Sequence, residues 1–398
     1  MPSPTPSSTS DKPAGEILTE VRDRYAEGAT TQVPQLCCPV DYDPKFLEVI
    51  PKEVVERDYG CGDPSRWLQE GETVLDLGSG TGKICFIASQ VVGAEGRVIG
   101  VDMTDDMLDV ARRAAPVVAE RVGFSNVTFH KGRIEDLALD RGALDRWLAE
   151  HPVQGEEELA AAEAYMDTER QEHPMVADDS VDVVVSNCVL NLVTPGAKAQ
   201  MFDEIFRVLK KGGRAVISDI VSDETVPQHL VNDPELWTGC ISGAYREDAF
   251  VKAFEDAGFH GIEIVSRGVA PWHTVEGIEF RSVTVRAFKG KHGPCKEQGH
   301  AILYKGPWSE VKDDDGHTFP RGVPMAVCGK TYRIMTTGPY AASVVGLEPA
   351  TPVAEEDAAN FPCDGDRQRT PGELKGSVTL GGDSVDGDGA CEPDGTCC

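Results

Sequence analysis

The sequence predicts an α/β fold built on a doubly wound, Rossmann-like parallel sheet. Short apolar segments alternate with amphipathic ones between residues 71 and 220, a glycine-rich turn follows the first apolar segment, and an acidic residue ends the second. The order of strand, turn, helix, strand and acid is typical of a nucleoside-binding site.

Five segments have the length and composition of buried strands: TVLDL at 73–77, RVIGVD at 97–102, NVTFHKG at 126–132, VDVVVSN at 181–187 and RAVISDI at 214–220. Helical segments separate them, among them DDMLDVARRAAPVVAERVG at 105–123. Strands that alternate with helices in this way pair in parallel, because each helix carries the chain back to the start of the next strand.

The remaining regions differ from this core in composition. Residues 1–70 form an N-terminal segment with a helix expected over 15–26, the vicinal pair Cys37 and Cys38, and the tetrad YGCG. Residues 138–178 are expected to form a two-helix insertion at the sheet edge, and residues 221–289 supply two closing strands.

Beyond residue 289 the sequence predicts a small C-terminal module over 290–350, in which HAILYKGPW and MAVCGKTYRIM resemble strands. Residues 351–398 are acidic, end in CEPDGTCC and are expected to be a flexible tail.

The composition restricts the class of protein. The chain has 398 residues, 40% of them hydrophobic and 26% charged, which is typical of a globular protein with a sizeable core. Its net charge of −29 argues against a nucleic-acid substrate, because phosphate backbones bind basic surfaces. We see neither a membrane-spanning apolar run nor a secretory signal, so we expect a cytoplasmic protein without nucleic-acid or membrane partners.

The glycine-rich turn at residues 77–82 favours S-adenosylmethionine over a dinucleotide. Glycine allows positive φ and close approach of the backbone to a ligand. A dinucleotide fingerprint has its last glycine where this chain has Lys83, whereas the D-x-G-x-G-x-G spacing that begins at Asp76 suits a cofactor without pyrophosphate. Asp102, 26 residues after Asp76, stands where an acid can accept both ribose hydroxyls.

Three cysteines stand next to segments that we expect at the mouth of this site. Cys188 follows the fourth strand, and open α/β sheets bind ligands outside the carboxyl ends of their strands. Cys61, in YGCG, belongs to a segment that could cover the site as a lid. Cys240 lies beyond the fifth strand, in a stretch where Gly239 and Gly243 allow close approach.

These thiols together suggest chemistry on a soft element. Thiolate sulfur selects thiophilic centres rather than magnesium or calcium. Trivalent arsenic bound by three thiolates keeps a lone pair that can attack a sulfonium methyl group in line, so no general base is required. Two electrons must then return to arsenic. Cys61 and either Cys37 or Cys38 can supply them by closing to a disulfide, and thioredoxin or glutathione would then reduce that disulfide.

The other cysteines carry no comparable signal. The twelve cysteines include no C-x-x-C pair, so the spacing supports neither a zinc finger nor, in a cytoplasmic chain, a disulfide framework. Cys85 is expected to pack in the core. No flanking motif sets apart Cys295, Cys328 and Cys363.

The chain resembles the arsenite S-adenosylmethionine methyltransferases in five motifs: YGCG, VLDLGSGTGK, GVDMTDDMLDVA, VVVSNCVLNLV and WTGCISGA. The resemblance implies that Cys61, Cys188 and Cys240 bind trivalent arsenic, that Cys188 and Cys240 suffice for a methylated trivalent arsenical, and that the product serves arsenic detoxification. It also implies a fourth thiol upstream, either Cys37 or Cys38. For the cofactor it implies Tyr59, Gly60, Asp76, Gly78, Ser79, Gly80, Asp102, Met103, Met107, Ile134, Glu135, Asn187 and Val189.

Two other functions remain open from the sequence. A carbon or oxygen methyltransferase for a small organic molecule would need a His, Asp or Tyr base near Asn187. A thiol protein that only sequesters heavy metals would not need the acids and glycines between Asp76 and Asp102, which disfavours it.

Overall fold

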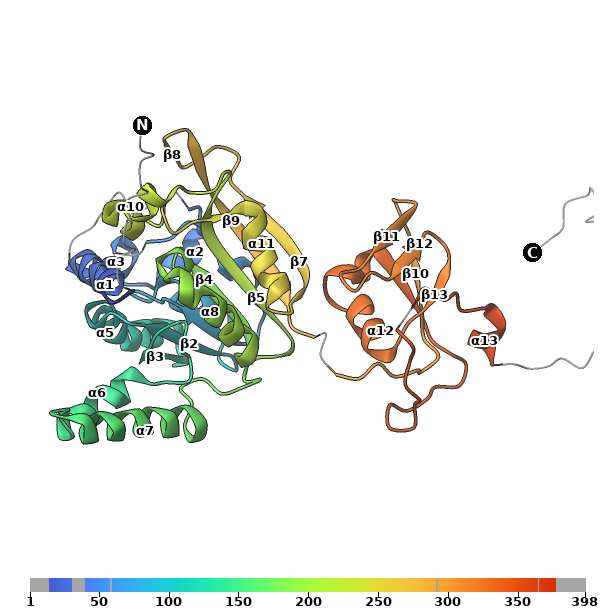
Figure 1. Ribbon diagram of the computed structural model, residues 1–398, viewed down its shortest axis with the longest axis horizontal. Helices are drawn as coiled ribbons and strands as arrows, with labels where there is room; N and C mark the ends of the chain where they lie inside the picture. Colours follow the sequence, from blue (N-terminus) through green and yellow to red (C-terminus); the bar gives the residue numbers. More distant parts are fainter. Residues whose placement is uncertain (1–13, 31–39, 58, 291–292, 364, 377–398) are drawn as a thin grey trace, which may run out of the picture. The chain divides into compact units, whose positions relative to one another are not determined.

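The structure is a computed structural model that describes residues 14–30, 40–57, 59–290, 293–363 and 365–376. The chain forms two compact units, residues 1–290 and 291–398 (Figure 1). Cys37, Cys38 and the cysteines of the C-terminal CEPDGTCC lie outside the described residues. Within the described ranges, no helix combines the length and apolar character needed to cross a membrane.

The first unit is built around one mixed sheet with the strand order β3-β2-β1-β4-β5-β9-β7. Five strands run parallel: β1 Thr73–Leu77, β2 Arg97–Asp102, β3 Val127–Lys131, β4 Val181–Asn187 and β5 Leu209–Ser222. The antiparallel strand β9 Ile278–Phe288 lies between β5 and β7 His260–Arg267, and the short strands β6 Tyr245–Arg246 and β8 His273–Val275 pair with β5 and β9. The predicted doubly wound α/β class is confirmed.

Helices cover both faces of this sheet because alternate strand residues are apolar on both sides. On one face Val74, Val183 and Val185 pack with residues of α4 Lys83–Val92 and α5 Asp105–Val122. On the other face Leu75 and Val184 pack with residues of α8 Pro195–Val208 and α11 Glu247–Asp256.

Further helical elements belong to the first unit. They are α1 Ala14–Thr30, α2 Pro44–Leu47, α3 Lys52–Glu56, η2 Pro64–Trp67, η3 Leu190–Leu192, α9 Gln228–Val231 and α10 Pro234–Thr238. Helix α1 contacts both α5 and α10, so the N-terminal segment lies beside the region that follows β5.

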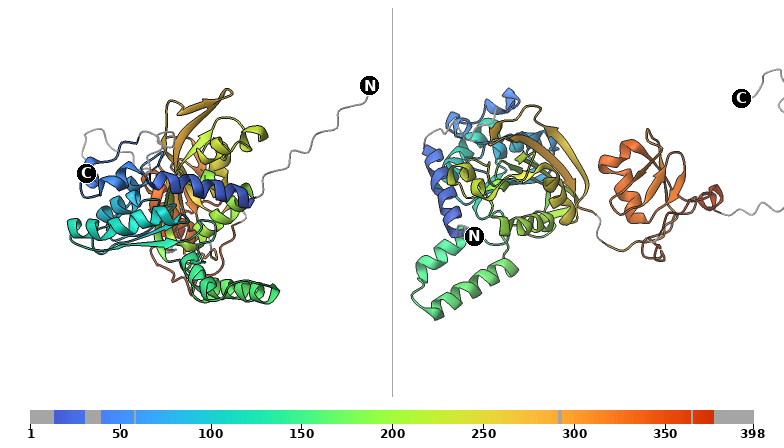
Figure 2. Two further views of the ribbon diagram at one scale, coloured as in Figure 1. Left: turned by 90° about the vertical axis from the view of Figure 1, so that its left-hand side faces the viewer. Right: turned by 45° about the horizontal axis from the view of Figure 1, so that its top comes forward.

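The insertion forms two helices, as the sequence predicts. They are α6 Arg141–Glu150 and α7 Glu156–Glu172, and they follow the edge strand β3. Figures 1 and 2 show this pair projecting from the first unit. Trp147 of α6 stacks on Tyr165 of α7 with ring centroids 4.8 Å apart, which fixes the two helices against each other.

The second unit contains a three-stranded antiparallel sheet of β10 Ala301–Tyr304, β13 Pro324–Ala326 and β14 Val344–Leu347, and a hairpin of β11 Glu310–Lys312 and β12 Thr318–Pro320. Its remaining elements are α12 Gly329–Thr336, η4 Gly338–Ser343 and α13 Pro371–Lys375. A separate small core, with Ile302, Phe319 and Met325 among its members, joins β10, β12, β13, β14 and α12.

Two sequence predictions differ from this unit. MAVCGKTYRIM was expected to be a strand, but only its start lies in β13, and α12 begins after Cys328. The Cys328 sulfur caps that helix, and Thr331 and Met335, one turn apart, form its buried face. The expected boundary at residue 350 is also absent from the structure: the Ala326 N–H donates to the Arg367 carbonyl at 2.7 Å, so residues beyond 350 pack in the same unit.

Candidate active site

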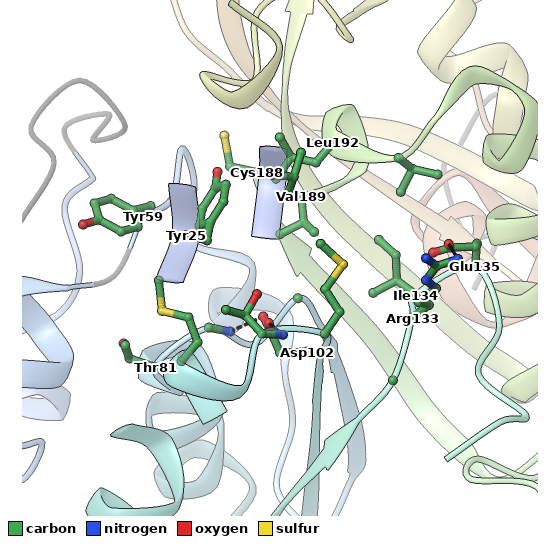
Figure 3. A pocket seen from close by; sticks show the side chains of 18 of the residues that line it. Tyr25, Tyr59, Thr81, Asp102, Arg133, Ile134, Glu135, Cys188, Val189 and Leu192 are labelled. Carbon is green, nitrogen blue, oxygen red and sulfur yellow. Dashed lines mark hydrogen bonds and ion pairs between the residues drawn. The ribbon is translucent and has the colours of Figure 1, made fainter. Parts of the chain in front are cut away.

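A cavity of about 800 Å³, including its open mouth, lies at the carboxyl ends of the parallel strands. This is the edge at which open α/β sheets bind ligands. In Figure 3 Asp102 lies on one side of the cavity, with Cys188 across from it and Ile134 and Glu135 toward a third side. Its lining includes nine of the residues implied for the cofactor: Tyr59, Gly78, Gly80, Asp102, Met103, Met107, Ile134, Glu135 and Val189.

The glycine-rich turn has the backbone that its sequence predicts. Gly78, Gly80 and Gly82 have φ values of 68°, 52° and 92°, a region in which other residues are strained. A Cβ on Gly78 would lie 2.5 Å from Val189, so this glycine allows the turn to pack against the end of β4. The turn thereby lines the cavity where the ends of β1 and β4 meet.

Asp102 ends β2 with its carboxylate held by backbone donors. One oxygen accepts the Gly80 N–H at 2.9 Å and the other accepts the Thr104 N–H at 2.8 Å. Burial raises the pKa of Asp102, and these hydrogen bonds partly offset the increase. The carboxylate is fixed in direction before any ligand enters, as a ribose-binding acid requires.

Four residues implied for the cofactor lie beside the cavity rather than in its lining: Gly60, Asp76, Ser79 and Asn187. Asp76 is buried and accepts a hydrogen bond from the Cys85 thiol at 3.2 Å. The Ser79 hydroxyl is buried and has no hydrogen-bond partner within the described part of the chain. Asn187 contacts the YGCG segment.

Asn187 joins the YGCG segment to the end of β4. Its side-chain oxygen accepts the N–H groups of Cys61 and Gly62, at 2.9 and 3.1 Å, and its side-chain nitrogen donates to the Gly62 carbonyl and to Tyr42. Gly60 lies directly on this amide, where a Cβ would be 2.3 Å from its nitrogen. YGCG therefore has little freedom to move away from β4.

Cys61, Cys188 and Cys240 belong to one buried cluster, although they come from three distant segments. The sulfur atoms of Cys61 and Cys188 and a carboxylate oxygen of Asp219 all lie within 4.8 Å of one another. The Cys240 thiol donates to the Cys188 carbonyl at 3.1 Å. The three thiols are each at most 6% exposed, and Cys188 also lines the cavity.

The backbone is unusual at two of these cysteines. Cys188 and Cys240 have φ values of 63° and 61°, in the left-handed region that residues other than glycine rarely adopt. Such strain at two residues of one cluster is typical of functional sites, because the surrounding structure must hold it in place.

The three thiols influence one another electrostatically. The interaction with Cys240 lowers the pKa of Cys188, but the hydrogen bond with Cys61 and burial outweigh it, so this pKa lies well above its ordinary value. The hydrogen bond with Cys188, followed by burial, raises the pKa of Cys240 in the same way. Both thiols are therefore protonated at neutral pH without a ligand.

Three residues that the sequence analysis did not single out surround the thiols. The Tyr25 hydroxyl lies 3.8 Å from the Cys240 sulfur. Asp219 is buried, which raises its pKa to about 6, and accepts backbone hydrogen bonds from Leu190 and Ile220. Lys198 is buried too, which lowers its pKa to about 8, and it donates to the Gly243 carbonyl at 2.6 Å.

The parallel sheet, the glycine turn and the acid at the end of β2 define a class I S-adenosylmethionine-dependent methyltransferase. Residues 68–168 and 159–258 match a family model described as a methyltransferase domain. Residues 291–379 match a family described as a domain of unknown function (DUF8838).

The chain belongs to the arsenite methyltransferase family. It is 33% identical over 317 residues to the arsenite methyltransferase of Aquipseudomonas alcaligenes, covering 75% of this chain and 81% of that protein. The arsenite methyltransferase of Mus musculus is 31% identical over 340 residues, or 82% of this chain and 80% of that protein. CrArsM, an arsenic(III) S-adenosylmethionine methyltransferase from Chlamydomonas reinhardtii, has a solved structure that matches 80% of this chain and 99% of its own, with 29% identity and a TM-score of 0.53. The family expected from the five motifs is thus confirmed.

Proposed function

We propose that the protein methylates trivalent arsenic held by Cys61, Cys188 and Cys240. The convergence of the three cysteines in one buried cluster, with Cys188 at the wall of the cofactor cavity, is the observation that carries this proposal. The Cys61 and Cys188 sulfurs lie within 4.8 Å of each other, and the Cys240 thiol contacts the Cys188 carbonyl. Three soft ligands suit a thiophilic centre, and a three-coordinate centre keeps one side open.

The residues that line the cavity suit the cofactor. Its apolar walls include Met103, Met107 and Ile134, which suit an adenine ring, and the fixed carboxylate of Asp102 suits ribose hydroxyls. When bound, S-adenosylmethionine supplies a sulfonium methyl group that a lone pair on arsenic can accept. Residues around Cys188 would then hold arsenic in line with that group. Because the two reacting atoms are already held together, the entropy cost of bringing them together does not add to the barrier for methyl transfer.

The protonated thiols are suited to bind arsenite directly. Arsenite is As(OH)₃ at neutral pH, and three thiols condense with it to form three As–S bonds and three water molecules. No proton is released overall, so the raised pKa values of Cys188 and Cys240 do not oppose binding. Burial of the cluster excludes water that would reverse the condensation.

A methylated trivalent arsenical needs only two of these thiols. Carbon already occupies one of the three positions on arsenic, so Cys188 and Cys240 complete its coordination. The contact of the Cys240 thiol with the Cys188 carbonyl supports this assignment, since it joins these two residues without Cys61.

The catalytic cycle also needs two electrons. Arsenic that has accepted a methyl group is pentavalent and carries a positive charge. A thiolate of Cys37 or Cys38 would attack the Cys61 sulfur, the Cys61–As bond would break, and its electron pair would stay on arsenic. A dithiol such as thioredoxin, or glutathione, would then reduce the disulfide.

The two alternatives have less support. A carbon or oxygen methyltransferase would need a free base, but Asp219 is occupied by backbone N–H donors, and burial raises the pKa of Tyr25 well above its ordinary value. Sequestration alone would leave the cofactor cavity without a role.

The test is incubation of the reduced protein with labelled S-adenosylmethionine, arsenite and thioredoxin, followed by separation of the products as arsenicals. We expect label in mono- and then dimethylated arsenic. Label that appears only in organic acceptors would overturn the proposal.

A further inference from the structure

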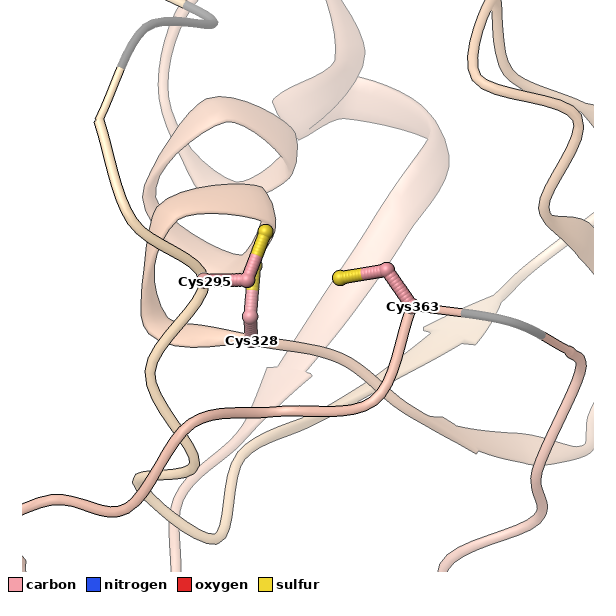
Figure 4. Close-up of side chains that lie close together, drawn as sticks. All are labelled: Cys295, Cys328 and Cys363. Atoms are coloured by element: carbon pink, nitrogen blue, oxygen red, sulfur yellow. The ribbon is translucent and has the colours of Figure 1, made fainter.

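A second group of three thiols lies in the C-terminal unit. The sulfur atoms of Cys295, Cys328 and Cys363 all lie within 4.8 Å of one another, and none of the three is in a disulfide. Figure 4 shows the Cys363 sulfur pointing toward the sulfurs of Cys295 and Cys328. The three cysteines come from positions far apart in the sequence, so the fold, rather than a local motif, brings them together.

Backbone hydrogen bonds hold the three segments in place. The Phe361 N–H donates to the Cys295 carbonyl at 2.9 Å, and the Glu297 N–H donates to the Ala359 carbonyl at 2.9 Å. These bonds pair the segment before Cys363 with the segment after Cys295. The Gly329 N–H, next to Cys328, donates to the carbonyl of Lys296 at 2.9 Å. The Cys295 segment is therefore hydrogen-bonded both to the segment before Cys363 and to the segment of Cys328.

Hydrogen-bond donors lie close to the sulfurs of Cys328 and Cys295. The Cys328 sulfur caps α12 and accepts the Thr331 N–H at 3.4 Å. Burial alone would raise the pKa of Cys295, but hydrogen bonds from Cys363 and Cys328 and the charge of Lys330 outweigh it and lower this pKa. Conversely, burial and the hydrogen bond with Cys295 raise the pKa of Cys363 to about 12. Such dependence of one thiol's pKa on its neighbour is typical of thiols that share one site.

We propose that Cys295, Cys328 and Cys363 form a second trithiol site that binds a trivalent metalloid such as arsenic or antimony. The site would be separate from the catalytic thiols, and the proposal does not depend on the methyl transfer described above. Binding of arsenite would again form three As–S bonds and release three water molecules.

Trivalent arsenic fits this group better than zinc does. Structural zinc takes four protein ligands, and within the described ranges no His, Asp, Glu or further Cys completes the group. Three-coordinate arsenic needs no fourth ligand. Cys363 is exposed and Cys295 partly exposed, so the group can be reached from solvent, whereas the catalytic thiols are all buried.

The site can be isolated by substitution in the full-length chain. A background variant would carry serine at Cys37, Cys38, Cys61, Cys188, Cys240, Cys391, Cys397 and Cys398. The protein, reduced with a phosphine that contains no thiol, is mixed with arsenite, freed of excess by gel filtration, and assayed for arsenic per chain. We expect one arsenic per chain and three As–S distances in X-ray absorption at the arsenic edge.

Cys363→Ser in this background should reduce the bound arsenic to near zero, and circular dichroism should remain unchanged because Cys363 is exposed. Cys85→Ala is the matched control, since Cys85 is a cysteine outside the group, and it should keep one arsenic per chain. Unchanged binding in Cys363→Ser, or only two As–S distances, would overturn the proposal.

Zinc provides an independent comparison. Zinc displaces thiol protons, so its affinity should rise with pH, whereas arsenite affinity should be constant between about pH 6 and 8. Cobalt(II) can report tetrahedral thiolate coordination by its absorption. Tight tetrahedral cobalt and zinc binding together with no retention of arsenite would identify a zinc site and contradict the assignment.

Discussion

The side-chain oxygen of Asn187 accepts the backbone N–H of Cys61 at 2.9 Å. Asn187 is the last residue of β4 and directly precedes Cys188, so one amide links the segments that carry two of the three thiols proposed to bind arsenic. This contact explains how YGCG, which has no strand or long helix of its own, places Cys61 near Cys188. Asn187 is therefore best described as a positioning residue.

Asn187→Ala should weaken arsenite binding while largely sparing the monomethylated substrate. The change removes the acceptor for two N–H groups, and such hydrogen bonds are each worth about 0.5 to 1.5 kcal/mol, so we expect an affinity loss of about 5- to 150-fold. In the proposed ligand set the methylated substrate uses only Cys188 and Cys240, so it should lose little. Calorimetric titration with both arsenicals measures the difference.

Tyr42→Phe is the control for this prediction. It removes the hydroxyl that contacts Asn187 and the Gly62 carbonyl but leaves the bond between Asn187 and Cys61 intact. Its effect on arsenite binding should be smaller. Equal losses for arsenite and for the methylated substrate in Asn187→Ala would argue for general unfolding instead of displacement of Cys61.

The three cysteines proposed to bind arsenic should divide into two groups on substitution. Cys188→Ser and Cys240→Ser should abolish methylation of both arsenite and the monomethylated arsenical, whereas Cys61→Ser should abolish only the first. S-adenosylmethionine affinity in each variant serves as the internal control and should be unchanged. Full activity on arsenite in the Cys188 or Cys240 variant would exclude the proposed ligand set.

Asp102→Ala should raise the KM for S-adenosylmethionine without changing the affinity for arsenite. Hydrogen bonds to a charged group contribute about 1.5 to 3 kcal/mol each, so an increase of at least about 10-fold is expected. Asp105→Ala, at an exposed acid three residues away that pairs with Lys131, should leave the KM nearly constant. A rise of similar size in the control would mean that general charge, not ribose binding, is responsible.

The sheet and the glycine turn were predictable because their signals are local. Runs such as VDVVVSN are apolar on both faces, as a buried parallel strand requires, and Gly78 and Gly82 are needed for backbone that other residues resist. The same holds for Asp102, whose position at the end of β2 follows from the strand pattern.

Contacts between distant segments could not be predicted in this way. Tyr25 reaches Cys240 from α1, and Cys363 reaches Cys295 through backbone pairing across more than sixty residues; no local spacing encodes either contact. MAVCGKTYRIM was expected to be a strand because its first three residues are apolar, and the cap that begins the helix after Cys328 depends on a sulfur atom. Asp219 was missed because it stands in the middle of an apolar strand.

The last prediction concerns the effect of pH on stability through Asp219. Burial raises its pKa from 3.8 to about 6, so folding favours the protonated form. The stability that protonated Asp219 contributes is complete below pH 3.8 and is lost as pH rises through about 6. At about 1.4 kcal/mol per pH unit, the loss is about 3 kcal/mol.

Asp219→Asn isolates this effect, because asparagine does not titrate. The variant should be less stable than the parent at pH 4, since its amide nitrogen cannot accept the N–H groups of Leu190 and Asn191. The difference in free energy of unfolding between parent and variant should then shrink by up to about 3 kcal/mol as pH rises from 4 to 7. Urea unfolding, followed by the fluorescence of the buried Trp237, measures this difference. A deficit that grows with pH would show that the carboxylate is stabilised in the folded state, and hence that backbone donors outweigh burial at this position.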